Sequence, residues 1–236
     1  MRLRSAALLA VIVILMILVS CKSTETAPVF SDEEIDVTLN YVLKKANDEA
    51  VSYMFRDLNE LKENMIPEQY SAMDEYRSEI PGMDMLLTDW AAYTTSFIIP
   101  MFDDFTAYTI QITETQKFAD PRTLLNSGTS SISLYMRRLH LNEITQTVRQ
   151  SITGMDLSFW RMAVIQYNAW VNTRAVLSGQ EAKPLPADLS DEAFLDIIAS
   201  HLADLYFNHL SSAEIMIRTT PDPDMDQTAA RVLGLV

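Results

Sequence analysis

The fold is decided by residues 31–61, which read SDEEIDVTLNYVLKKANDEAVSYMFRDLNEL. Ser31-Asp32-Glu33-Glu34 is typical of a helix start, because Ser31 can accept a hydrogen bond from the third helical amide while Glu34 reaches back. Apolar side chains then recur at the spacing that places them on one helical face: Ile35, Leu39, Val42, Leu43, Ala46, Ala50, Met54 and Leu58. The stretch therefore predicts a long helix with one buried stripe.

The rest of the body reads as further helices with recognisable ends. Helices are predicted at residues 84–99, 101–118, 129–152, 156–178 and 190–219, with short ones after Asp120-Pro121 and before Gly234. Pro100 should end or kink the chain between the first two. Residues 62–83 and 180–189 carry prolines and are predicted to be irregular. We predict an all-α, helical-bundle-like single domain of about six to eight helices.

The first twenty residues have the features of a secretory signal. Arg2 and Arg4 form a basic start, and residues 6–19 are an unbroken apolar run of 14 residues. A membrane-spanning helix needs about 20 apolar residues, whereas a secretory signal uses about 7–15. The run favours a leader at residues 1–20. The alternative is an uncleaved signal anchor with an ordinary buried cysteine.

Leu18-Val19-Ser20-Cys21 resembles the bacterial lipobox, in which small residues precede a cysteine that is acylated and becomes the mature N-terminus. The resemblance implies a lipoprotein held on a membrane by acyl chains on Cys21. Such a lipoprotein would be located in the bacterial cell envelope, on the outer membrane or on the periplasm-facing inner membrane. Cys21 is the chain's one cysteine, so no intramolecular disulfide is expected. Residues 21–30 then form the lipidated cysteine and a polar tether, and residues 31–236 the folded domain.

The part behind the leader is acidic. Of 18 Lys and Arg residues, two lie in the leader, which leaves 16 against 32 acidic side chains and a net charge of −16. Phosphate neutralisation dominates affinity for nucleic acid, so a nucleic-acid partner is not expected. Anionic head groups would also repel this body, so membrane attachment must come from lipid rather than from a basic patch.

Two groups of motifs suggest a family. The middle of the chain carries Phe118-x-Asp120, Leu124-Leu125-Asn126-x-Gly128-Thr129 and Tyr135-Met136-Arg137, and the end carries Ala213-Glu214-x-x-Ile217-Arg218-x-x-Pro221 and residues 230–234. With an opening helix over residues 35–51, these motifs resemble the family called domain of unknown function 4197, exported helical bacterial proteins.

The family resemblance implies a helical fold and an envelope address, but no mechanism, because the family has no established activity. Its shared positions make candidate site residues of Asp120, Asn126, Gly128, Glu214 and Arg218. The sequence departs from the family at Pro121, where alanine is common, and at Leu233, where phenylalanine is usual. Residues 62–83 match poorly.

Metal chemistry is weakly indicated. Asp222-Pro223-Asp224-Met225-Asp226 begins like a calcium loop, but Gln227 occupies the position that needs glycine. We therefore interpret Asp226 as the cap of the last helix. Among the three histidines, His140, His201 and His209, the last two could share a helical face with Asp204, but zinc sites usually have shorter spacing. No metal or cofactor is predicted.

Two further features favour structural interpretations. Glu214 and Arg218 are spaced i,i+4 with the acid first, which favours a helical ion pair worth a few tenths of a kcal/mol. Four methionines lie in or beside the irregular stretch, where they would fill a core or form an adaptable binding surface: Met65, Met73, Met83 and Met85. Core filling is the favoured interpretation.

The favoured function is a non-catalytic envelope lipoprotein that binds a protein or an apolar ligand. The alternatives are an envelope enzyme, such as a hydrolase, with an unrecognised Asp/Glu/His site, and a structural envelope protein. No catalytic residue can be assigned, because no known catalytic motif is present. Convergent histidines and carboxylates in a polar cleft would favour the enzyme, whereas an apolar groove would favour the binding protein.

Overall fold

The computed structural model describes residues 29–56, 65–175, 177, 179, 182–187 and 189–236. The predicted leader and Cys21 lie outside the described residues. The chain divides between Ser31 and Asp32, and the second unit carries all the helices described below. Those described residues form helices and no strand, which confirms the predicted all-α fold.

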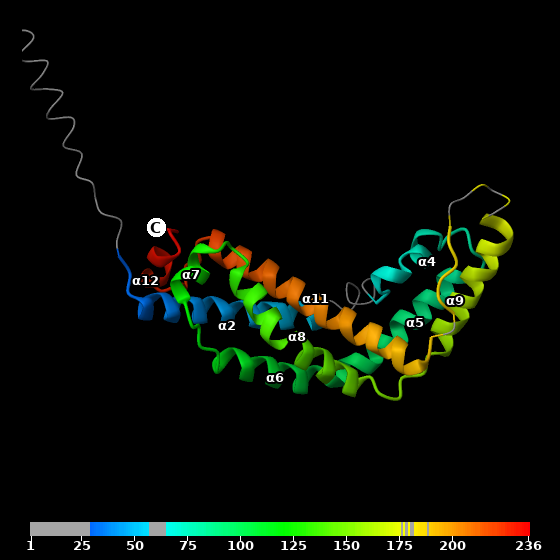
Figure 1. The fold of residues 1–236 in the computed structure, drawn as a ribbon, viewed down its shortest axis with the longest axis horizontal. Coiled ribbons are helices and arrows are strands. Elements are labelled where there is room, and N and C mark those ends of the chain that lie inside the picture. Colours follow the sequence, from blue (N-terminus) through cyan, green and yellow to red (C-terminus); the bar gives the residue numbers. More distant parts are fainter. Residues whose placement is uncertain (1–28, 57–64, 176, 178, 180–181, 188) are drawn as a thin grey trace, which may run out of the picture. The chain divides into compact units, whose positions relative to one another are not determined.

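Two long helices form the centre of the second unit. Helix α2 (Asp32–Arg56) begins directly after Ser31, and α11 (Asp191–Thr219) packs along it (Figure 1). The predicted stripe of α2 is buried from Ile35 to Met54, and Leu58, its last predicted member, lies outside the described residues. A buried hydrogen bond of 2.7 Å from the Tyr206 hydroxyl to Asn47 Oδ1 joins the two helices. Other helices pack around this pair: α6 (Phe102–Glu114), α7 (Pro121–Asn126) and α12 (Gln227–Val232) against α2, and α8 (Ser131–Ser151) against α11.

A second group of helices packs around the beginning of α11. Helix α5 (Met83–Ile98) lies against α9 (Ser158–Trp170), which also contacts α4 (Ala72–Glu75). The group has an aromatic core, in which the fully buried Trp90 lies 5.2 Å from Trp160 between ring centroids. Phe194 of α11 stacks on Trp160 at 4.6 Å. Helix α11 therefore contributes to both groups.

The positions where helices were predicted to be interrupted lie close to the observed interruptions. Pro100 falls in a 3-10 turn, η2 (Ile99–Met101), which links α5 directly to α6. Among its described residues, the stretch predicted to be irregular contains the 3-10 turn η1 (Glu68–Tyr70), α4 and the first residue of α5. Helix α9 continues into a π-helical turn, η3 (Val171–Ala175). This turn comes shortly before residues 180–189, the segment predicted to be irregular, which we call the linker.

Helix α11 begins where it was predicted to begin, and α12 has its predicted cap. Ser190 Oγ accepts a hydrogen bond of 3.2 Å from the Ala193 amide at the start of α11. Asp226 accepts from the amides of Thr228 and Ala229 at the start of α12. These amide hydrogen bonds hold the pKa of Asp226 below its usual range.

Replacing Ser190 by alanine should lower the free energy of unfolding by about 1 kcal/mol, because the Ala193 amide loses its acceptor at the helix start. Urea denaturation followed by circular dichroism would measure the change. Ser200→Ala is the matched control, since Ser200 is exposed in the middle of α11 and alanine is the better helix former there. Equal losses from both variants would contradict the capping role.

No helix among the described residues is long and apolar enough to span a bilayer.

Candidate functional site

Two of the family-motif residues meet in a buried cluster. Arg218 Nη1 donates to Glu214 Oε1 at 2.9 Å, which confirms the predicted i,i+4 pair. The pair is buried, however, since Glu214 is only 1% exposed and Arg218 8%. The stabilisation of a few tenths of a kcal/mol expected for an exposed helical ion pair therefore does not apply to this buried pair.

The Glu214 carboxylate caps a helix that is distant in the sequence. It accepts hydrogen bonds from the amides of Ile132 and Ser133, at 3.0 and 2.7 Å, and from Ser133 Oγ at 2.6 Å. Ser130, the residue at the N-cap position of α8, makes no capping bond with its side chain. Glu214 thus supplies to α8 the acceptor that a local cap would provide, and a negative charge is favourable at that helix end.

Arg218 ties the same helix start to α7. Its guanidinium donates to Ser131 Oγ at 2.9 Å and to the Leu125 carbonyl oxygen at 2.7 Å. Ser131 Oγ in turn donates to the Leu124 carbonyl oxygen at 2.6 Å. The cluster of Ser131, Ser133, Glu214 and Arg218 therefore fixes α7, α8 and α11 together.

The other three motif positions make local contacts. Asp120 caps α7 by accepting from the Thr123 amide and hydroxyl, which hold the pKa of Asp120 below its usual range. Asn126 donates to the Arg122 carbonyl oxygen one turn back. Gly128 has φ of +116°, a conformation that favours glycine, and lies between α7 and α8. These contacts account for the five positions through helix capping and packing.

The side chains of the two candidate metal motifs make other contacts in the structure. Asp204 pairs with Arg137 of α8, and the His209 ring lies 4.5 Å from the Tyr53 ring. Asp222 contacts Lys45 of α2 and also accepts from the Asp224 amide. Within the described part of the chain, no three His, Cys, Asp or Glu side chains gather closely enough to hold a metal ion.

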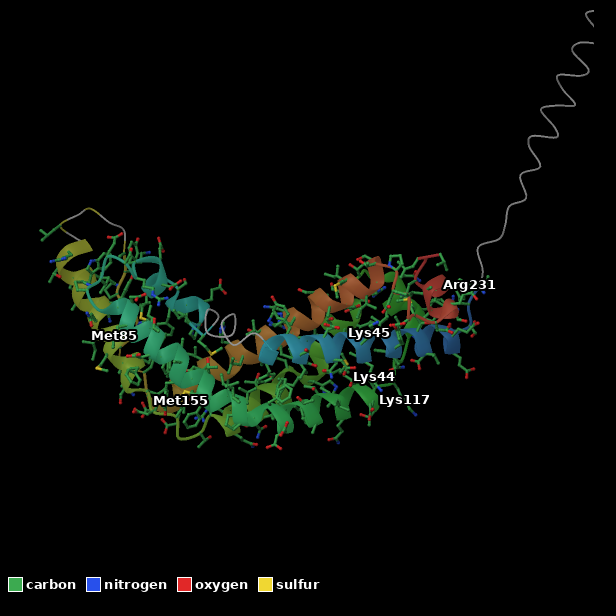
Figure 2. All side chains as sticks on the ribbon, turned by 180° about the vertical axis from the view of Figure 1, so that it is seen from behind. Lys44, Lys45, Met85, Lys117, Met155 and Arg231 are labelled. Atoms are coloured by element: carbon green, nitrogen blue, oxygen red, sulfur yellow. The ribbon has the colours of Figure 1, made fainter. Side chains whose placement is uncertain are left out.

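The methionines of the irregular stretch are mostly core residues. Met65, Met73 and Met83 are buried, which confirms the favoured interpretation for these three. Met85 differs, because it is 62% exposed on the surface of α5 (Figure 2).

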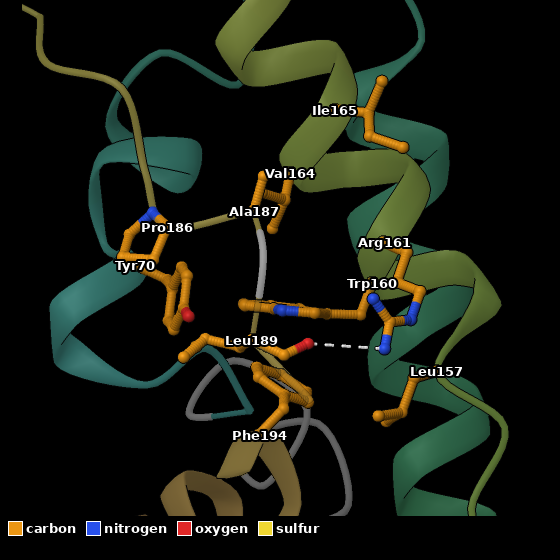
Figure 3. A pocket seen from close by; sticks show the side chains of 10 residues that line it. All are labelled: Tyr70, Leu157, Trp160, Arg161, Val164, Ile165, Pro186, Ala187, Leu189 and Phe194. Carbon is orange, nitrogen blue, oxygen red and sulfur yellow. Dashed lines mark hydrogen bonds between the residues drawn. The ribbon is translucent and has the colours of Figure 1, made fainter. Parts of the chain in front are cut away.

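An apolar pocket opens beside the aromatic core. The Trp160 ring contacts both the Phe194 ring and the Tyr70 ring, and the Tyr70 centroid lies 4.7 Å away with the ring nearly perpendicular (Figure 3). These three rings are almost fully buried, and burial raises the pKa of Tyr70, so the phenol stays neutral. The cavity measures about 80 Å³, and its lining also includes Leu157, Arg161, Val164, Ile165, Pro186, Ala187 and Leu189.

The described part of the predicted linker forms one wall of this pocket. Asn168 of α9 holds the linker with two hydrogen bonds, donating to the Leu185 carbonyl oxygen at 2.8 Å and accepting from its amide at 2.7 Å. Arg161 lies at the rim, where it pairs with Asp191. Its Nη2 donates to the Leu189 carbonyl oxygen at 3.5 Å (Figure 3). Ile165, which is 63% exposed, lies at the edge. The pocket thus has an aromatic base and an accessible apolar edge.

A second, wider hollow lies between α2 and α11. It measures about 390 Å³ and is lined by Glu49, Ala50, Tyr53, His209, Ser212, Ala213 and Met216. We call it the α2/α11 groove.

No family model, curated protein or solved structure matches the chain. The resemblance to the domain of unknown function 4197 family stays a prediction.

The aromatic pocket was not predicted from the sequence. Its three rings come from segments far apart in the chain, and Tyr70 lies in the stretch where no regular helix was expected. Only the linker gave a signal, because Pro184 and Pro186 predicted that residues 180–189 are irregular, and the described part of that segment lines the pocket.

Proposed function

We propose that this protein is a membrane-anchored envelope lipoprotein whose helical domain is a non-catalytic interaction module. The aromatic pocket of Tyr70, Trp160 and Phe194 is the observation that carries the binding part of the proposal. It is an apolar hollow with a single charged side chain at its rim, as expected of a binding site rather than of a hydrolytic one.

The size of the pocket favours a protein partner over a free ligand. Pockets for small ligands usually measure about 300–1,000 Å³. A cavity of about 80 Å³ admits one apolar side chain, the kind of anchor that contributes most of the affinity at protein interfaces. The exposed Ile165 at its edge, and the nearby exposed Met162 on the same helix, would extend the contact.

A site-specific crosslink tests the proposal. A photoreactive benzoylphenylalanine in place of Ile165 should give a discrete adduct in intact cells after illumination, because that position borders the pocket. The same group in place of Leu134 is the matched control, since Leu134 is 61% exposed on α8 and does not line the pocket. Mass spectrometry of the adduct would identify the partner.

A pocket-filling variant makes the test specific. Ala187 is exposed and lines the pocket, so Ala187→Trp should occupy the cavity and abolish the Ile165 adduct without lowering the melting temperature. An adduct that survives Ala187→Trp, or that forms equally from position 134, would overturn the pocket as the docking site.

A further inference from the structure

The α2/α11 groove has the size of a small-ligand site. Its volume of about 390 Å³ lies within the usual range for such sites. Its floor explains the hollow, because Ala50 and Ala213, which are 1% and 8% exposed, have methyl side chains that leave the space between the helices unfilled. The groove is therefore built by small residues on two helices that belong to the same packed core.

The walls of the groove combine a carboxylate, aromatic rings and a thioether. Glu49 and Tyr53 come from α2, whereas His209, Ser212 and Met216 come from α11. The Tyr53 ring lies 4.5 Å from the His209 ring at an interplanar angle of 47°. Tyr53 remains 47% exposed and Met216 52% exposed, so both line a surface that a ligand can reach.

The charges at the groove favour a cation. Glu49 forms no ion pair with any residue that the structure describes. The two nearby lysines are engaged elsewhere, Lys44 with Glu114 and Lys45 with Asp222. The chain has a net charge of −14, which attracts cations toward such a hollow.

We propose that the α2/α11 groove binds a small organic cation, with its ammonium or guanidinium group held by Glu49 and Tyr53 and its apolar body on the alanine floor toward Met216. A carboxylate beside an aromatic ring is the chemistry that recognises such cations, because the ring face attracts positive charge and the carboxylate pairs with it. The small apolar floor requires the ligand to carry an apolar body as well.

The groove holds the ligand without reacting with it. The Ser212 hydroxyl donates to the Asn208 carbonyl oxygen one turn back, at 3.0 Å, so it serves the backbone of its own helix rather than a neighbouring base. The site is separate from the aromatic pocket, so its test is independent of the proposed function.

Three probes of one shape test the proposal: benzylammonium, benzyl alcohol and benzoate. Each would be titrated into the full chain in nanodiscs, with the methyl resonance of Met216 as the readout and Met216→Leu to assign it. Benzylammonium should give a saturable shift, benzyl alcohol a weaker one and benzoate none. Glu49→Gln should weaken benzylammonium binding by about tenfold, the effect of losing one charge-assisted contact.

Asp48→Asn is the matched control, because it removes the same charge one residue away, from a side chain that does not line the groove. It should change the affinity less than about twofold, the weak effect of a screened charge. If Glu49→Gln and Asp48→Asn lowered the benzylammonium affinity equally, the cation would be attracted only by the overall negative charge of the protein, and the proposed site would be overturned. Absence of a saturable shift, or equal binding of benzyl alcohol and benzylammonium, would overturn it too.

Discussion

Replacing Glu214 by alanine should lower the free energy of unfolding by about 3–5 kcal/mol, as expected when one partner of a buried ion pair is removed. The substitution leaves Arg218 buried without its counterion and deprives two amides at the start of α8 of their acceptor. Chemical denaturation of the variant and the parent protein would measure the loss. Hydrogen exchange should also accelerate at Ile132 and Ser133.

Two further variants separate the effect of truncating a side chain on α11 from the effect of leaving Arg218 unpaired. Asn208→Ala is the control for truncation on α11, because Asn208 is exposed there and its loss should cost almost nothing. Adding Arg218→Met to Glu214→Ala should recover part of the stability, since it removes the unpaired buried charge. If Glu214→Ala were as mild as Asn208→Ala, the buried cluster would not stabilise the fold.

Replacing Cys21 by serine should move the protein from the membrane fraction to the soluble fraction, reducing the bound share by at least about tenfold. Acylation of the predicted lipobox would need the cysteine thiol, and the acidic body behind it has no charge attraction to anionic head groups. Membrane fractionation would measure the distribution, and mass spectrometry of the mature N-terminus would detect the acyl chains.

Ser20→Ala is the matched control for the anchor, because alanine keeps a small residue before the cysteine and should leave acylation unchanged. A Cys21→Ser protein that stays membrane-bound, together with a parent chain that keeps residues 1–20 and carries no lipid, would contradict the lipoprotein proposal. It would instead favour the uncleaved signal anchor.

Local signals predicted the helices well, because each depends on residues close in the sequence. The described part of the α2 stripe, the Asp120 and Asp226 caps, the start of α11 and the interruption at Pro100 all lie where spacing and capping chemistry placed them. The Glu214–Arg218 pair was predicted for the same reason, since its partners are one helical turn apart.

The long-range contacts could not be predicted. The sequence contains Ser131, Ser133 and Glu214, but nothing in their spacing shows that the carboxylate meets the start of α8, because that depends on how α8 packs against α11. The two hollows were missed for the same reason. A cavity forms where side chains from several helices leave space unfilled, as the small side chains of Ala50 and Ala213 do in the groove.

The remote cap of α8 makes the order of synthesis matter. Glu214 follows Ser133 by 81 residues, so its carboxylate reaches α8 only after the whole of α8 and the long segment behind it have been made. A nascent or prematurely terminated chain that stops short of this residue carries the whole of α8 with the amides of Ile132 and Ser133 still open to water. Such chains should be selectively degraded, which leaves completed copies to accumulate.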